Sequence, residues 1–327
     1  MKVRSIPPHA AALLLAALFN AQVYAAPACR TDAATQIPIS VGKGSLQNPC
    51  FSPNGEELAF TLFTTGYNQG KAIVEAVSTA GGAPFTPPLS PATAQSVNLP
   101  GQCWSAASNR VAYSSDIVDR DEIYLVSAGG GVPVRITNRP GLLAWEPSLS
   151  PPLADGSQWI VFESHAQANP DGPGQLWKVR VDGGGLTQLT SGFDDRQPQW
   201  SPRGDRIVFQ RQIKTDQWDV LTIDTSGGGI FNVTGKPALS NTDPSWSPSG
   251  DYIVYSAGGA DIDVANLFVI PAGGGSATRI SFSCGLDGAP GWSADGTRIA
   301  FESASSDPDQ TGASTTIWVI DAPTGIR

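Results

Sequence analysis

One motif occurs six times along this chain of 327 residues, and it constrains the fold more than any other feature. Its copies are NPCFSPNGEELAF (48–60), GQCWSAASNRVAY (101–113), EPSLSPPLADGSQWIVF (146–162), QPQWSPRGDRIVF (197–209), DPSWSPSGDYIVY (243–255) and APGWSADGTRIAF (289–301). The aligned serines are separated by 53, 45, 51, 46 and 46 residues. A period of this length is typical of folds built from repeated supersecondary units.

Each copy predicts two strands joined by a tight turn. Pro-x-Trp-Ser is a short strand whose Trp can pack between neighbouring sheets, and Ser-Pro-x-Gly supplies the proline and glycine of a turn. Arg-Ile-Val-Phe predicts a buried second strand, and a third apolar run then ends at three glycines in four of the copies (129–131, 183–185, 227–229 and 273–275). Short β-branched segments follow these glycines, so we interpret them as hairpin turns and not as phosphate-binding loops, which a helix would follow.

Four strands in each of six repeats predict an all-β fold, a six-bladed β-propeller of four-stranded blades. The last repeat supplies only three strands before the chain stops at TTIWVIDAPTGIR. The segment TQIPIS (35–40) resembles the fourth strands PVRIT and TQLTS. We therefore expect the N-terminal strand to complete the last blade and close the ring, which removes an open sheet edge. The alternative is that TQIPIS is a loose tail.

The N-terminus has the features of a bacterial secretory signal peptide. Lys2 and Arg4 precede a nine-residue apolar run at 11–19, and Val23-Tyr24-Ala25 forms a small-residue cleavage site. A membrane anchor would need about 18 apolar residues. We expect a signal peptide at 1–25, an N-terminal segment at 26–34 and the propeller at 35–327. The mature protein should be periplasmic or secreted, with no membrane span.

Charge argues against nucleic acid as a partner. Loss of Lys2 and Arg4 with the signal peptide lowers the formal net charge from −9 to −11. Affinity for nucleic acid depends on neutralisation of phosphates by Lys and Arg, and this chain has a large excess of acids.

The motif resembles the P-x-W-S-P-D-G-x-x-I-A-F repeat of the TolB-like, or PD40, propellers, which are also described as WD40-like. The resemblance covers residues 35–327 and implies a non-catalytic, exported protein-interaction module, a monomer with a protein partner in the cell envelope. TolB itself has an α/β domain ahead of its propeller, and peptidases with similar repeats add a hydrolase domain; we expect neither here. A true WD40 repeat is disfavoured because Trp-Asp occurs once, at Trp218-Asp219.

The sequence offers few residues for catalysis, and we expect no cofactor. After signal removal the one histidine is His165, which we interpret as a solvated loop residue, so a histidine triad is excluded. One acidic stretch of the sequence contains Asp116, Asp119, Asp121 and Glu122, and we interpret these residues as solvated loop charge. The alternative function is a lyase or hydrolase acting on a polysaccharide through a carboxylate or metal site.

Asp307 and Asp309 are a weak candidate metal site. The run from Ser306 has the opening of a calcium-binding loop, but Trp318 stands where such a loop places its bidentate Glu.

A candidate binding site follows from the propeller geometry. The residue before the motif proline should begin each innermost strand, and these residues should therefore ring one mouth of the central channel. The polar members are Asn48, Glu146, Gln197 and Asp243, and the remaining equivalents are Gly101 and Ala289. Ordinary hydration of a polar channel is one interpretation. The functional one is recognition of a cation, a basic peptide terminus or a partner loop.

The four cysteines allow three complete pairings, and export permits disulfides. Cys50 and Cys103 hold equivalent places in adjacent repeats, each just before the motif aromatic residue. We take them as the candidate bridge, with Cys29 and Cys284 either paired or free.

Overall fold

The computed structural model describes residues 30–41, 43–85, 97–100, 103–105, 109–235, 239–259, 265–305 and 314–326. The expected signal peptide, Cys29, Gly101 and the weak metal candidates Asp307 and Asp309 lie outside these ranges. The named elements are all β-strands. In the described part of the chain we find no helix with the length and hydrophobicity needed to cross a bilayer.

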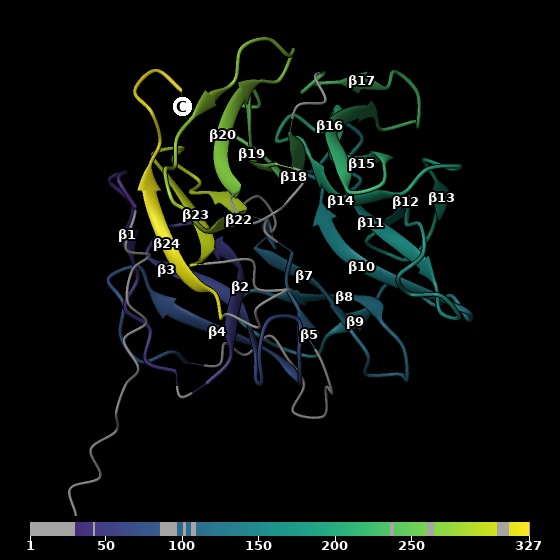
Figure 1. Ribbon diagram of the computed structural model, residues 1–327. Helices are drawn as coiled ribbons and strands as arrows, with labels where there is room; N and C mark the ends of the chain where they lie inside the picture. Colours follow the sequence, from purple (N-terminus) through teal and green to yellow (C-terminus); the bar gives the residue numbers. More distant parts are fainter. Residues whose placement is uncertain are drawn as a thin grey trace, which may run out of the picture.

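The strands form sheets arranged in a ring (Figure 1). The first sheet consists of β2 (Ser45–Phe51), β3 (Glu57–Phe63) and β4 (Ala72–Ser78). The second consists of β5 (Val97–Asn98), β7 (Arg110–Ser115), β8 (Glu122–Ser127) and β9 (Val134–Arg135), and β6 (Trp104–Ser105) also pairs with β7. The third consists of β10 (Leu142–Leu149), β11 (Trp159–Ala166), β12 (Gln175–Arg180) and β13 (Thr187–Gln188). The next sheet is β14 (Asp195–Trp200), β15 (Arg206–Lys214), β16 (Gln217–Asp224) and β17 (Phe231–Asn232).

The last sheet has eight strands in two halves. One half is β18 (Ser240–Trp246), β19 (Tyr252–Gly258), β20 (Ala265–Pro271) and β21 (Thr278–Arg279), and the other is β22 (Leu286–Trp292), β23 (Arg298–Ala304), β24 (Thr316–Asp321) and β1 (Thr35–Gln36). A single parallel pair, Ala265 with Leu286, joins the halves, whereas the neighbours within each half are antiparallel. The predicted all-β propeller with four-stranded blades is confirmed, although the first sheet has three named strands and only a single bridge, Ala76 to Phe85, at its outer edge.

The predicted closure by the N-terminal strand is also confirmed. Thr35 pairs with Val319 and Gln36 with Trp318, so β1 is the outer strand of the last sheet. The strand is shorter than the predicted 35–40 because the chain then crosses to the first sheet. Ile37 is buried in a cluster with Leu46 and Phe60, and Ile39 bridges to Gly82.

The core lies between neighbouring sheets. Trp200 packs in a cluster with Val161 of the preceding sheet, Trp246 in a cluster with Val208, and Trp292 in a cluster with Val254. These three motif tryptophans are thus buried against the preceding group of strands, as the sequence predicted, and this apolar burial is the main force that holds adjacent blades together.

The motif serine explains the sharp turn after each inner strand. The hydroxyl of Ser247 accepts a hydrogen bond from the N–H of Tyr252 at 3.1 Å, and Ser293 does the same for Arg298 at 2.9 Å. In the copy at 201–206, Gly204 has φ +74°, a left-handed conformation that a side chain would strain.

Candidate functional site

The residue before the motif proline has a left-handed backbone in every copy that the structure describes. The φ values are 52° at Asn48, 48° at Glu146, 50° at Gln197, 54° at Asp243 and 45° at Ala289. The pairing register of each inner strand shifts at this point, for example between Arg196 and Gln199, so each of these residues sits in a β-bulge. Left-handed residues other than glycine cost about 1–3 kcal/mol and concentrate at functional sites.

The bulges lie within the inner strands and not at their beginnings, which corrects the predicted position of these residues along the strand. These residues line a cavity inside the channel, of about 40 Å³, with Asn48, Glu146, Gln197, Asp243 and Ala289 alternating with prolines such as Pro198 and Pro244. Because a water molecule needs at least about 10–15 Å³, this cavity has room for a few waters or one small ion.

Side chains from the preceding sheet satisfy the N–H groups of the bulges. The N–H of Asn48 donates to Glu302 at 3.2 Å, that of Gln197 to Glu163 at 2.6 Å, and that of Asp243 to Gln210 at 2.8 Å. Each acceptor directly follows the aromatic residue of a second strand, Phe301, Phe162 or Phe209. Sequence reasoning missed these three residues, although a polar residue right after the apolar run was a signal for them.

The channel therefore has more carboxylates than the sequence predicted. Burial raises the pKa of Glu146 well above its usual range, and the nearby carboxylates of Glu163, Asp243 and Glu302 raise it further. Burial also raises the pKa of Asp243, against hydrogen bonds from the Ala289 N–H, Gln197 and Thr242. These acids repel one another, so a cation entering the channel would be attracted to all of them.

A second cavity of about 210 Å³ lies beside the first and shares Asp243 with it. We call it the mouth pocket. Its walls include the acids Asp216, Asp243 and Glu302 and the aromatic rings of Tyr67 and Trp218. The Tyr67 hydroxyl donates to Glu302 at 3.3 Å, which ties the loop after β3 to the last sheet. Acids beside aromatic faces are a suitable environment for an ammonium or guanidinium group.

His165 is a buried strand residue, which corrects its interpretation as a solvated loop residue. It is 1% exposed at the end of β11, and its ring lies 4.7 Å from that of Trp145. Nδ1 donates to the Gly172 carbonyl at 2.9 Å, while Nε2 lies 3.1 Å from Glu163. Because a carbonyl only accepts, the contact with Glu163 needs a second hydrogen on His165 or on the carboxyl.

The acidic stretch around residue 120 is also more buried than predicted. Glu122 is fully buried, where it accepts hydrogen bonds from Arg120 at 2.8 Å and from the Arg139 N–H at 3.0 Å. Asp121 accepts from the Trp145 indole at 2.7 Å, and burial raises its pKa. Only Asp119 matches the predicted solvated charge, with a side chain 83% exposed. This stretch is structural: it attaches a loop to β10.

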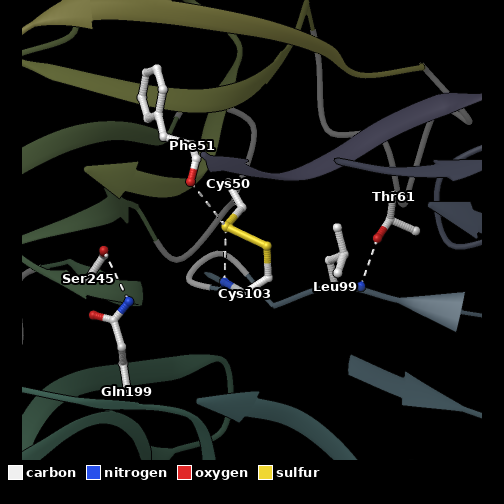
Figure 2. Close-up of a disulfide and its surroundings, with 7 residues drawn as sticks. All are labelled: Cys50, Phe51, Thr61, Leu99, Cys103, Gln199 and Ser245. Carbon is white, nitrogen blue, oxygen red and sulfur yellow. Dashed lines mark hydrogen bonds between the residues drawn. A yellow bond between two sulfur atoms is a disulfide. The ribbon is translucent and has the colours of Figure 1, made fainter. Parts of the chain in front are cut away.

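A disulfide joins Cys50 of β2 to Cys103, just before β6, with their Cα atoms 6.1 Å apart (Figure 2). The Cys103 N–H also points at the Cys50 sulfur, at 3.1 Å. Gln199 and Ser245, which line the channel cavity, appear in the same view. The bridge therefore connects the inner strands of the first two sheets. Cys284 is disulfide-bonded as well.

Metal ligation has no support in the part of the chain that the structure describes. Within those ranges no three His, Cys, Asp or Glu side chains are grouped so that they could hold a metal ion.

Solved structures similar to this chain share its fold at low sequence identity. A TolB candidate from Agrobacterium tumefaciens superposes with a TM-score of 0.60 at 21% identity, over 86% of this chain and 91% of that one. TolB from Acinetobacter baumannii also gives 0.60, at 18% identity, over 83% and 65%. An oligogalacturonate lyase in complex with manganese gives 0.53 at 14% identity, over 88% and 80%. The same fold thus occurs in TolB and in a lyase, and the likeness at these identities shows the fold alone.

Comparison of the sequence with known proteins and family models identifies the family of this chain. An uncharacterised protein of Agrobacterium fabrum is 30% identical over 143 residues, and the matching part spans 43% of this chain and 43% of the relative. The family model described as PD40, TolB beta propeller domain, matches residues 18–264, well over half of the chain. With its six motif copies and its ring of sheets, this chain belongs to the PD40, TolB β-propeller domain family.

Proposed function

We propose that this chain is a non-catalytic, exported protein-interaction module that binds a basic group of a cell-envelope partner at the mouth pocket. One observation carries the proposal: three acids, Asp216, Asp243 and Glu302, and two aromatic rings face one cavity at the end of the channel. A lysine or arginine side chain, or a peptide amine, matches the charge of this cavity. The 210 Å³ volume admits such a group and is about five times that of the 40 Å³ cavity with which it shares Asp243.

The channel acids strengthen this preference. The carboxylates that raise the pKa of Glu146 come from three different strands, β11, β18 and β23, so their field converges on the channel axis. A cation at the mouth pocket lies next to Asp243, which belongs to both cavities. Clefts lined by one sign of charge concentrate counter-charged ligands and increase their association rates.

Two further features belong to the proposal. We count the two halves of the eight-stranded sheet as separate blades, which makes a six-bladed ring in agreement with the six motif copies. We also propose that residues 1–25 direct export and that the mature protein works in the periplasm or outside the cell as a monomer. An envelope location suits the disulfides, which form and persist in oxidising compartments.

The test compares partner capture by the wild type and by Glu146→Gln/Asp243→Asn. The double variant keeps the size of both side chains and replaces two channel carboxyls, of which Asp243 also lines the mouth pocket. We expect envelope proteins captured by the immobilised wild type to be lost or reduced several-fold with the variant. Because the attraction is electrostatic, we also expect capture by the wild type to fall as salt rises from about 50 to 300 mM, and capture by the variant to depend less on salt.

The matched control is Glu56→Gln/Asp321→Asn, which also removes two charges but at exposed positions outside both cavities. It should behave like the wild type. Equal capture by the wild type and the channel variant would place recognition elsewhere. Turnover of a polysaccharide by the purified chain would contradict the non-catalytic assignment and favour a carboxylate-dependent lyase or hydrolase.

A further inference from the structure

A third cavity, of about 440 Å³, lies away from the channel between the sheet β14–β17 and the strands β18–β21. We call it the inter-blade groove. Its walls come from the motif turn of one blade (Arg203, Asp205, Arg206), from Thr222 and Phe231 on the outer strands of that blade, and from Trp246 of the next blade. None of these residues lines either channel cavity.

The preceding pair of blades shows why this groove is open. In the sheet β10–β13, Lys178 pairs with Val161, and its amine reaches across to the Thr225 carbonyl of the next blade at 2.6 Å. The same amine lies 4.7 Å from the Trp159 ring. A long side chain and a large ring thus close the space between these blades.

The equivalent positions in the next sheet hold different residues. Thr222 pairs with Val208 as Lys178 pairs with Val161, and Arg206 occupies the place of Trp159. Thr222 is too short to cross to the next blade, and the Arg206 guanidinium turns back to the Thr222 hydroxyl at 3.2 Å and the Gly229 carbonyl at 2.7 Å. Glycines 229, 250 and 273 add backbone without side chains to the walls. The strand pairing is the same in both sheets, so the groove results from the replacement of Lys178 and Trp159 by their equivalents Thr222 and Arg206.

The chemistry of the walls points to a neutral, hydroxyl-rich ligand. Each charge is already paired or hydrogen-bonded: Arg203 with Asp251 at 2.5 Å, Arg206 with Asp224 at 3.0 Å, and Asp205 with the Ser201 hydroxyl at 2.6 Å. A charged ligand would have to compete with these partners. A sugar hydroxyl, by contrast, can donate to a carboxylate and accept from a guanidinium without breaking an ion pair.

Phe231 supplies the apolar surface that such a ligand needs. Its side chain belongs to β17 and remains 43% exposed, and it lines the groove together with the buried Trp246. The C–H face of a pyranose ring can pack against an aromatic ring. A volume of about 440 Å³ also lies within the range of about 300–1,000 Å³ typical of small-molecule sites.

We propose that the inter-blade groove binds a neutral saccharide unit, either a free sugar or one unit of a glycan chain. Phe231 packs against the ring, and Arg203, Arg206 and Asp205 hydrogen-bond its hydroxyls. This site is separate from the mouth pocket, so a protein partner and a saccharide can be bound at the same time.

Calorimetric titration of the mature protein tests the proposal, with maltose, cellobiose and N,N′-diacetylchitobiose and their six-unit oligomers as probes. We expect at least one probe to bind with a dissociation constant of about 1 mM or below. Tighter binding of the hexamer than of the dimer would identify a glycan chain as the ligand, and equal binding a free sugar.

Variants connect the binding to the groove. Phe231→Ala should weaken saccharide binding about tenfold. Thr222→Lys introduces the residue found at the equivalent position, Lys178, and should abolish saccharide binding by filling the groove. Phe282→Ala is the matched control, because Phe282 is also 43% exposed but lies outside the groove, and it should bind like the wild type. Should Thr222→Lys fail to fold, Phe231→Ala decides alone. Failure of all six probes to bind, or undiminished binding by Phe231→Ala, would overturn the proposal and leave the proposed protein partner unaffected.

Discussion

At the scale of single residues, the channel acids connect the fold to its electrostatics. Asp243 and Glu146 belong to inner strands in which a left-handed residue precedes proline, so the bulge that interrupts the strand also turns a carboxyl toward the channel. Both carboxyls have a raised pKa because burial penalises their charged forms. The protein thus keeps two acids where their ionised forms are unfavourable, which is a common property of functional sites.

The first prediction concerns the pH dependence of stability. A carboxyl whose pKa is raised by folding adds stability that is complete below its unfolded pKa and is lost as the pH rises through the folded pKa. Glu146 and Asp243 should therefore destabilise the fold at neutral pH and stop doing so on acidification. Glu146→Gln/Asp243→Asn should unfold at a higher urea concentration than the wild type at about pH 7, and the difference should shrink toward about pH 5.

Urea titrations of both proteins at several pH values measure this effect. Glu56→Gln/Asp321→Asn again serves as the control, since those side chains are exposed and should shift stability little. A channel variant less stable than the wild type at neutral pH would show that the acids contribute favourable hydrogen bonds that outweigh their burial.

At the scale of elements, the repeat predicted the strand order well because each strand is one apolar run between turn residues. It also predicted that Asn48, Glu146, Gln197 and Asp243 surround one channel, since equivalent residues of a ring must face the same axis. It did not predict the bulge. A proline indicates that strand pairing is interrupted, but the sequence does not show at which residue the pairing continues.

The residues missed by sequence reasoning have a shared physical origin. Glu163 and Gln210 follow an apolar run, where a polar residue usually marks the exit of a strand to solvent. Here the second strands continue beside a buried polar channel, so these side chains are buried and accept the N–H groups of the bulges. His165 was misjudged for the same reason: β11 extends to Ala166 because Leu142 of β10 pairs with it.

The second prediction concerns the disulfide between the first two sheets. The Cys50–Cys103 bridge closes a loop of 53 residues, for which the chain-entropy model gives about 4 kcal/mol of stabilisation, and measured values typically fall at about 2–4 kcal/mol. Cys50→Ala/Cys103→Ala should lose stability in this range in urea titrations while keeping the β-sheet signal in circular dichroism. Non-reducing peptide mapping of the wild type should recover the two peptides linked. Recovery of Cys50 linked to Cys284 would contradict the bridge.

At the scale of the whole molecule, ring closure depends on the segment that precedes β1 as well as on β1. Arg30 places its guanidinium among the strands of the last sheet, where it pairs with Asp32 at 2.8 Å and with Asp287 and donates to Ser303 at 3.0 Å. The guanidinium also lies 4.6 Å from the Trp318 ring. A two-residue strand makes few hydrogen bonds, so this buried pair adds to the attachment of the N-terminal segment, together with backbone hydrogen bonds such as that from Thr31 to Phe282.

The last prediction tests this attachment. Asp287 is fully buried, and burial raises its pKa while Arg30 opposes the rise. Arg30→Ala leaves the carboxyl buried without that partner, which should cost about 3–5 kcal/mol of unfolding free energy at neutral pH. The loss should shrink on acidification, because protonation of Asp287 removes the unpaired charge.

Adding Asp287→Asn to Arg30→Ala should restore much of the stability in urea titrations, since the amide carries no charge to bury. If the double variant is as unstable as the single one, the contribution of Arg30 comes from its packing on Trp318 and not from its charge. In that case, Arg30→Met should retain most of the stability of the wild type.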